Sequence, residues 1–413
     1  MQLAAPQRFL GPRAFLACAL AVELLIIMSI DMYVPALPSM QREFGVTEAY
    51  LNLTMFAFFA VGAVGVVFAG PLSDRLGRKP VFVFGSALFT ASSLGCMLAP
   101  SVEVLVLFRM GEALGYGAVT TVETAIVKDA FSGSDLKTAM TCLQSFILIG
   151  PAAAPFLGTF VLEHGGWRGI FAALVAFGVV ATVLALLISE TLPREARAGC
   201  ESVGAALSST LRGVRLLARE KGFLPMVGIL GVASVPYFAF IAVISYVLLD
   251  HFAVSYGFYN VLYLLFCLVT IVAPYVYAAA SKRVHGSTVL KACIGLTALS
   301  GVLLGLFGLA GPLVFLAAFV PATLAEGVIR PMSYVVLLDQ PNDRVGAASS
   351  FSHFSYNAFT AVATVIATLP WTNFVFGLAV ITGASAVAMA AAYAGGLRGR
   401  KLDGGHYNPG EEA

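Results

Sequence analysis

The sequence predicts an all-α integral membrane protein with twelve transmembrane helices in two six-helix halves. Hydrophobic residues make up 59% of the 413 residues and charged residues only 11%, more apolar surface than a soluble core of this size can bury. The apolar residues gather in windows of about 20 residues, the length at which a helix crosses a bilayer. Transmembrane β-strands are about half as long and alternate in polarity, so these continuous runs indicate helices.

Six apolar windows precede a polar break and six follow it. The first set covers residues 14–38, 49–70, 80–99, 102–127, 138–161 and 169–189. The second set covers residues 223–248, 256–280, 288–310, 312–338, 346–369 and 373–396. We therefore expect four parts: an N-terminal six-helix half at 1–189, a cytoplasmic linker at 190–222, a C-terminal six-helix half at 223–396 and a cytoplasmic tail at 397–413.

Lysine and arginine indicate the orientation of the spans. With the N-terminus placed inside, the predicted outer loops hold only Arg42 and Arg168, and the other basic residues near span ends fall in cytoplasmic segments. Because positive residues near span ends stay in the cytoplasm, both termini are expected there. Arg8 and Arg13 precede the first apolar run, and no small-residue cleavage site follows it, so we expect an uncleaved first span.

Composition and motifs also exclude several functions. A net charge of +2 with scattered basic residues does not suit a nucleic-acid binder. Five of the six cysteines lie in apolar runs without CxxC spacing or neighbouring histidines, so they are expected to pack and not to bind metal or form disulfides. The sequence has no Walker A loop, so it is not expected to hydrolyse ATP. We expect no metal and no cofactor.

The first span carries two acids, Glu23 and Asp31. Placing a carboxylate at bilayer depth is costly, so a span that keeps two of them is expected to need a titratable group. Eight positions along a helix place the two side chains about 80° and about 12 Å apart, so both can border one cavity. The pair predicts transport coupled to protons.

The loop between spans two and three has the most specific motif of the chain. Residues 70–80 read GPLSDRLGRKP, which resembles the loop signature of the major facilitator superfamily, G-x-L-x-D-R-x-G-R-[RK]. Asp74 can accept hydrogen bonds from basic groups. We expect a cytoplasmic gate formed by Asp74, Arg75, Arg78 and Asp129. The alternative is a simple positive-inside anchor, and the matching segment 280–286 keeps the basic residues without the acid.

Span four opens with a motif that resembles the R-x-x-Q-G-x-G pattern of the same family, at residues 109–117. The resemblance implies that Arg109 senses the protonation of the first-span acid, so Asp31 is its expected partner. Glu112 stands where the family usually has glutamine, and at three residues' distance it can pair with Arg109 instead. Proton coupling is therefore assigned to Asp31, Glu23, Arg109 and Glu112, with the main partner of Arg109 left open.

Span five resembles the family's antiporter signature, G-P-x-x-G-P-x-x-G, through Gly150, Pro151, Pro155 and Gly158, with Ala154 at the middle glycine. Small residues and prolines allow close helix approach and a bend. The resemblance implies drug–proton antiport, and the alternative is an ordinary packing seam of small residues.

Further similarities at 166–171, 190–193 and 238–248 extend the resemblance along the chain, to the Bcr/CflA-type drug-resistance branch. The resemblance implies a monomer in the bacterial inner membrane that exports amphipathic small molecules against protons by alternating access. An endogenous product such as a siderophore is an alternative substrate. A membrane receptor or enzyme on the same scaffold is the rival class.

The substrate cavity implied by the family layout would be lined by spans one, two, four, five, seven, eight, ten and eleven. Its candidate contacts are Met55, Phe58, Phe59, Gln144, Ser145, Tyr237, Phe238, Tyr263, Glu326, Arg330 and Asn357. Aromatic and methionine side chains would suit bulky amphipathic molecules. The alternatives are packing for the apolar residues and a self-neutralised i,i+4 salt bridge for Glu326 and Arg330.

Overall fold

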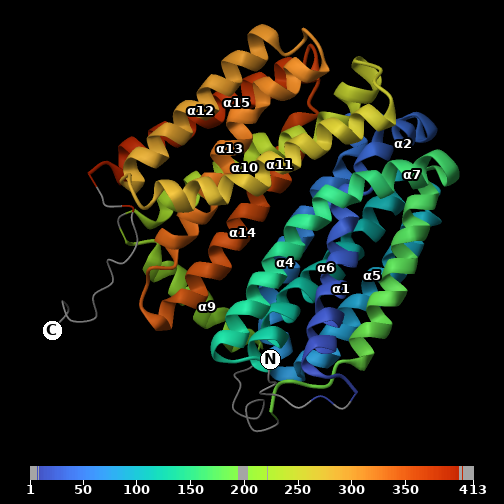
Figure 1. Cartoon of the computed structure of the whole chain (residues 1–413), viewed down its shortest axis with the longest axis vertical. Helices are drawn as coiled ribbons and strands as arrows, with labels where there is room; N and C mark the ends of the chain where they lie inside the picture. The colour runs from blue at the N-terminus through green and yellow to red at the C-terminus, as the bar shows by residue number, and fades with distance from the viewer. Residues whose placement is uncertain (1–6, 8, 194–202, 221, 400–401, 403–413) are drawn as a thin grey trace. The chain divides into compact units, whose positions relative to one another are not determined.

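Figure 1 shows the computed structural model, which describes residues 7, 9–193, 203–220, 222–399 and 402. The elements formed by these residues are helices, and no strand occurs among them. A helix satisfies its own backbone hydrogen bonds, which a bilayer core requires. The chain divides into two compact units, Met1–Ser208 and Ser209–Ala413.

The N-terminal unit consists of seven α-helices and a short 3₁₀ turn within the described residues. They are α1 (Pro12–Asp31), η1 (Val34–Ala36), α2 (Leu37–Phe44), α3 (Glu48–Leu51), α4 (Leu53–Leu76), α5 (Arg78–Met97), α6 (Val102–Ala130) and α7 (Gly133–Leu187).

Helix α7 is two helices joined at a sharp reversal. Gly166 has φ 63° and ψ −171°, a backbone conformation that glycine adopts without a Cβ clash. Figure 1 shows α7 turning back on itself, and the non-helical Gly166 divides it into an arm before the reversal and an arm after it. The two arms correspond to the predicted spans 138–161 and 169–189.

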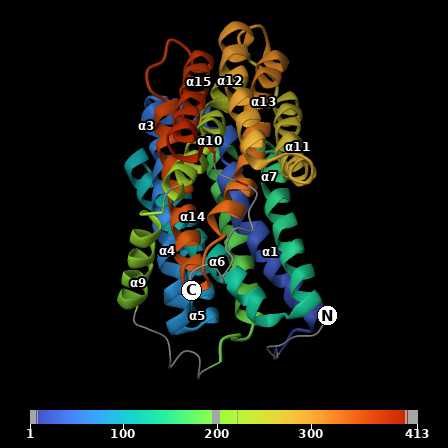
Figure 2. The ribbon, with the colours of Figure 1, turned by 90° about the vertical axis from the view of Figure 1, so that its left-hand side faces the viewer.

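The C-terminal unit repeats the pattern of long helices. Helix α9 (Val203–Leu217) begins just before the unit boundary. The others are α10 (Phe223–Ser245), η2 (Tyr246–His251), α11 (Tyr256–Ala280), α12 (Gly286–Phe307), α13 (Pro312–Leu337), α14 (Asn342–Ala367), α15 (Phe374–Ala392) and η3 (Tyr393–Leu397). Helices α12 and α15 pack side by side, as Figures 1 and 2 show.

Nine stretches among the described residues are long and apolar enough to cross a membrane. One of them, Ile149–Leu187, covers the first arm of α7 from Ile149 onward and the whole second arm. Helices α6 and α14 are long enough, at 29 and 26 residues, but are not among these nine stretches. When α6 and α14 are added to these stretches and the two arms of α7 are counted separately, each predicted span has a corresponding long helical segment. The predicted all-α membrane fold is confirmed.

Each unit has a buried apolar core. In the N-terminal unit Phe15 and Ala19 of α1 pack in one cluster with Val119 and Val122 of α6. In the C-terminal unit aromatic rings from different helices stack: the ring centroids of Phe240 and Phe319 lie 4.2 Å apart and nearly parallel. These cores hold the polar side chains described next.

Candidate functional site

Arg109 lies at the centre of a buried charged cluster in the N-terminal unit. Its side chain is 2% exposed, and Nη1 donates a hydrogen bond to Glu112 Oε2 at 2.7 Å. The other oxygen of Glu112 accepts from Ser93 Oγ of α5, also at 2.7 Å. The guanidinium carbon lies 4.5 Å from the ring centroid of Tyr33 and 4.4 Å from that of Phe58. The cation is therefore held between two aromatic faces and one carboxylate.

The ion-pair partner of Arg109 among the described residues is Glu112 and not the expected Asp31. A partner one turn away on the same helix needs no second helix to approach, which gives Glu112 the advantage. Asp31 is the last residue of α1 and is 4% exposed. Its charge acts on Tyr116 of α6, a partly buried tyrosine that also interacts with Glu23.

Glu23 lies in the middle of α1 and contacts a residue whose role the sequence did not indicate. Its carboxyl is in hydrogen-bonding contact with that of Glu123 on α6, and the two residues are 3% and 0% exposed. Glu123 belongs to none of the groups that were assigned from the sequence. The helix rotation that turns it towards α1 is not visible in a single sequence.

The expected gate residues meet at the junction of α4 and α5. Gly77 separates the helices with a positive φ of 105°, which permits the tight turn. Arg78 forms an ion pair with Asp74 and donates through Nε to Asp129 Oδ2 at 3.0 Å. Arg75, in contrast, lies exposed at the end of α4 and takes part in none of these ion pairs.

Glu190 completes this junction, a function that sequence reasoning did not assign. Its carboxylate accepts hydrogen bonds from the backbone N–H groups of Arg78 at 2.9 Å and Lys79 at 3.3 Å, which begin α5. An acid at a helix N-terminus satisfies free donors and complements the helix dipole. The Lys79 ammonium also donates to the backbone carbonyl of Leu186, at 2.7 Å. The end of α7 is thereby joined to the start of α5.

The antiporter-type motif lies where the first arm of α7 packs against α1. A Cβ added to Gly150 would meet Ile27 Cγ2 at 2.5 Å, and one added to Gly158 would meet the backbone oxygen of Met32 at 2.1 Å. Pro151 and Pro155 lie inside the same helical arm. Gly158 therefore permits a close backbone approach that no larger residue allows, and Gly150 leaves room for the Ile27 side chain.

The candidate cavity residues of the N-terminal unit are mostly packed inside it. Met55, Phe58 and Phe59 of α4 are 1%, 1% and 6% exposed. Phe58 also contacts Arg109, so it belongs to the charged cluster. Gln144 and Ser145 lie on α7, but their side chains fall outside the described residues.

In the C-terminal unit the candidate aromatic residues form a connected row. The ring centroid of Tyr237 lies 5.1 Å from that of Phe238 and 5.2 Å from that of Phe266. Tyr263 is buried and lies 5.7 Å from Phe266. Tyr237 and Phe238 are only partly buried within this unit.

Glu326 and Arg330 of α13 form a second charged cluster. Glu326 Oε1 accepts a hydrogen bond from the Tyr356 hydroxyl at 2.9 Å and lies 3.8 Å from Arg330 Nε. The Glu326 side chain is 2% exposed and that of Arg330 is 33% exposed. Nearby, Asn357 donates to the backbone carbonyl of His353 at 2.9 Å.

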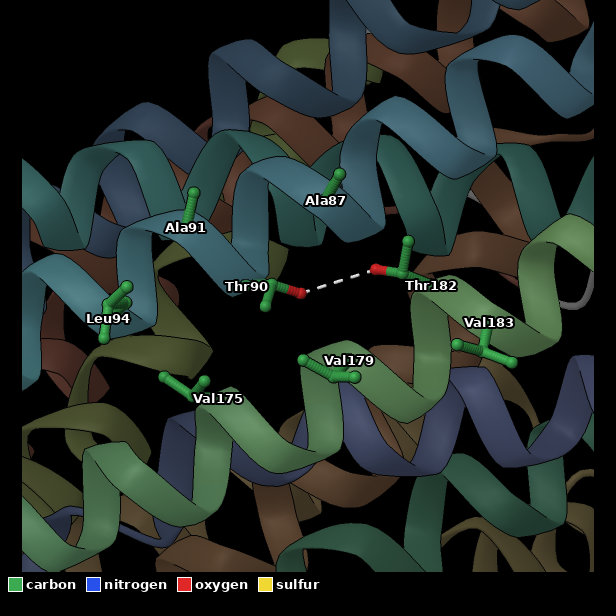
Figure 3. Close-up of a pocket in the computed structure, with 8 residues that line it drawn as sticks. All are labelled: Ala87, Thr90, Ala91, Leu94, Val175, Val179, Thr182 and Val183. Atoms are coloured by element: carbon green, nitrogen blue, oxygen red, sulfur yellow. Dashed lines mark hydrogen bonds between the residues drawn. The ribbon is translucent and has the colours of Figure 1, made fainter.

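A pocket of about 400 Å³ lies between α5 and the second arm of α7, and Figure 3 shows the residues that line it. Its lining is mostly apolar, and its two threonines, Thr90 and Thr182, are joined by a 3.4 Å hydrogen bond. These helices correspond to spans three and six, which are not among the spans that the family layout places around the substrate cavity. None of the candidate site residues lines it. Among the described residues no group of histidines, cysteines or acids has the arrangement of a metal site.

Comparison with known proteins identifies the family. The sequence profile of the Major Facilitator Superfamily matches residues 19–364. The uncharacterized MFS-type transporter YdgK of Bacillus subtilis is 25% identical over 344 residues, which cover 81% of this chain and 84% of that protein. The multidrug resistance protein MdtL of Shigella flexneri is 34% identical over 180 residues. That match covers 43% of this chain and 46% of MdtL, less than half of either.

Solved structures share the fold at low sequence identity. A D-xylose–proton symporter superposes with a TM-score of 0.73 at 15% identity, over 92% of this chain and 96% of that one. A peptide transporter in complex with sulfate gives a TM-score of 0.73 at 16% identity, over 95% and 96% of the two chains. These relatives are transporters and not enzymes. The chain belongs to the Major Facilitator Superfamily and is a multi-pass membrane transporter.

Proposed function

We propose that this transporter exports amphipathic small molecules across the bacterial inner membrane in exchange for protons. The observation that most supports the proposal is the burial of two acids, Glu23 and Asp31, in the apolar helix α1, where they are 3% and 4% exposed. Acids inside a membrane helix are costly, and a carboxyl group that gains and loses a proton explains why they are kept.

Proton binding and substrate binding would act on the same conformational equilibrium. Protonation of Asp31 removes a buried negative charge that acts on Tyr116. Arg109 is already neutralised by Glu112, so the proton works by changing the local field and not by breaking an Asp31–Arg109 bridge. A ligand shifts such an equilibrium only by its differential affinity for the two states.

The direction of transport is supported by the seam between α1 and α7. Gly158 lets the chain approach the backbone of Met32, and Gly150 makes room for the Ile27 side chain, in a motif that resembles the antiporter signature. The partial match to a multidrug resistance protein favours the same direction. Partly buried aromatic side chains such as Tyr237 and Phe238 offer adaptable apolar contacts for an amphipathic substrate.

The junction of α4 and α5 would act as a cytoplasmic latch, with both chain termini on that side. Arg78 binds Asp74 and Asp129 at once, so it ties α5 to the ends of α4 and α6. Ion pairs of this partly exposed kind are easily broken and remade, which suits a contact that opens once in each cycle.

A charged endogenous product, such as a siderophore, is the second candidate substrate. It is favoured by the cluster on α13, where the Arg330 side chain is one-third exposed and Glu326 Oε2 receives no donor among the described residues. A substrate with a charged group would bind there, whereas an amphipathic drug would not need the pair.

Substrate-induced proton movement in inverted membrane vesicles tests the proposal. Wild-type protein should release protons when substrate is added, Asp31→Asn should not, and the exposed acid variant Glu163→Gln should behave as wild type. Transport without proton movement would contradict antiport. Loss of transport in Arg330→Gln would identify the charged substrate class, and unchanged transport would favour the amphipathic one.

A further inference from the structure

Glu23 and Glu123 bring two acids together inside an apolar core. Their carboxyl groups are in hydrogen-bonding contact between α1 and α6, and both residues are more than nine-tenths buried. Ala19 and Val119, each one turn away on the same helices, belong to the main hydrophobic cluster of this unit. Water and its screening are therefore largely absent from the contact.

The two acids have no other donor among the described residues. Neither oxygen of Glu123, nor Oε2 of Glu23, receives a hydrogen bond from an N–H or O–H group of another residue. Ionised carboxylates only accept hydrogen bonds, so two of them cannot form one. The contact requires a proton on one of the acids.

Other charged groups among the described residues do not remove the need for a proton on Glu23 or Glu123. The neighbouring titratable group is the Tyr116 hydroxyl of α6, which feels Glu23 and Asp31 but carries no positive charge. On α4, Asp74 and Arg75 lie at its C-terminal end, and the charged side chains of the first arm of α7 lie near its two ends. Arg109 is paired with Glu112. No ion pair to a described cation neutralises Glu23 or Glu123, and two adjacent buried negative charges strongly disfavour each other.

We propose that Glu23 and Glu123 together hold one shared proton at neutral pH, which makes the α1–α6 contact a proton-binding site. The inference deepens the proposed function and rests on it for one point, that this proton is exchanged during transport. Glu123 then has a role equal to that of Glu23. The two acids titrate as a pair, in two coupled steps.

The pH dependence of thermal unfolding tests the site without substrate or membrane gradient. Purified full-length protein in detergent should lose stability as the pH rises from about 4.3, the ordinary pKa of glutamate, through neutral pH, because the folded pair keeps a proton that the unfolded chain has already released. Glu23→Gln and Glu123→Gln should each abolish this loss, since an amide replaces the neutral acid and still donates to the remaining carboxylate. The double variant should behave like either single variant.

This non-additivity is the decisive result. If Glu123→Gln keeps the wild-type pH profile, or if the two single effects add in the double variant, the acids titrate independently and the shared site is wrong. Glu163→Gln, an exposed acid, should keep the wild-type profile. Should a Gln variant fail to fold, infrared spectra of Asp31→Asn protein give a second readout. A protonated-carboxyl band that shifts in D₂O supports the site, and its absence at neutral pH overturns it.

Transport measurements in vesicles distinguish the existence of the proton site from its role in transport. Glu123→Gln should lose substrate-induced proton movement as Glu23→Gln does. If the unfolding profile is as expected but Glu123→Gln retains full proton coupling, the role of this proton in transport is overturned. If Asp31→Asn also retains coupling, the proposed function fails, while the unfolding profile still supports the proton site.

Discussion

Arg109 and Glu112 form a buried ion pair on one face of α6, with Nη1 and Oε2 2.7 Å apart and both side chains 2% exposed or less. The Arg109 guanidinium of this pair also packs against the aromatic rings of Tyr33 and Phe58. Any mechanism in which Arg109 responds to a proton must therefore start from a cation that already has a partner.

Replacing the acid of this pair should destabilise the N-terminal unit. Glu112→Gln leaves the Arg109 cation buried without its counter-charge, which costs about 3–5 kcal/mol in comparable buried pairs. The expected result is a clear fall in the unfolding temperature of the purified protein. Glu163→Gln, which changes an exposed acid on α7, should alter stability by about 0.5 kcal/mol or less. Equal stability of the two variants would show that Glu112 does not neutralise Arg109.

The seam between α1 and α7 should not tolerate a single added methyl group. In Gly158→Ala the new Cβ meets the backbone oxygen of Met32, which cannot move aside as a flexible side chain can. Overpacking of this kind costs about 1–3 kcal/mol, so both the unfolding temperature and the transport rate should fall. Gly165→Ala on the same helix is the matched control, because nothing lies within 4 Å of its added Cβ. Wild-type behaviour of Gly158→Ala would contradict the close backbone contact.

The latch should depend on Arg78 and not on its neighbour. Arg78→Gln removes the link between Asp74 and Asp129, and hydrogen bonds to charged groups contribute about 1.5–3 kcal/mol each. We expect faster protease cleavage near residues 70–80 and a changed transport rate. Arg75→Gln alters an exposed basic residue of the same loop and should leave both unchanged. If the two variants have the same effect, the loop acts only through its positive charge.

Glu190 should stabilise the start of α5 as a capping residue. Glu190→Ala removes the acceptor for the backbone N–H groups of Arg78 and Lys79 and should cost about 1 kcal/mol. Hydrogen exchange measures this directly, because the first turn of α5 should exchange faster while the middle of the helix does not. Unchanged exchange at Arg78 and Lys79 would exclude the cap.

Much of the fold follows from composition and from the lengths of the apolar runs. Each span must satisfy its own backbone hydrogen bonds and cross about the same thickness of lipid. The spans were predicted within a few residues, and the main difference is the single reversal at Gly166 that joins two of them. The sequence could not indicate the extra turn Tyr246–His251, where α10 continues as a π-helix, since a one-residue change in hydrogen bonding leaves no compositional trace.

The site was less predictable than the fold, because side-chain partners depend on helix rotation. Arg109 had two candidate partners, and only the structure places Glu112 against it. The contact between Glu23 and Glu123 joins helices that are far apart in sequence, so spacing along either helix gives no sign of it. Phe58 was expected to touch substrate, but its ring covers the Arg109 cation.

Proton-driven accumulation in proteoliposomes tests the central claim most directly. Purified protein is reconstituted with a transported compound, and a pH gradient is imposed across the vesicle membrane. Wild-type protein and Glu163→Gln should concentrate the compound against its own gradient as protons move the opposite way, whereas Asp31→Asn should only let it equilibrate. Accumulation by Asp31→Asn equal to that of wild type would contradict the assignment of the transported proton to the acids of α1.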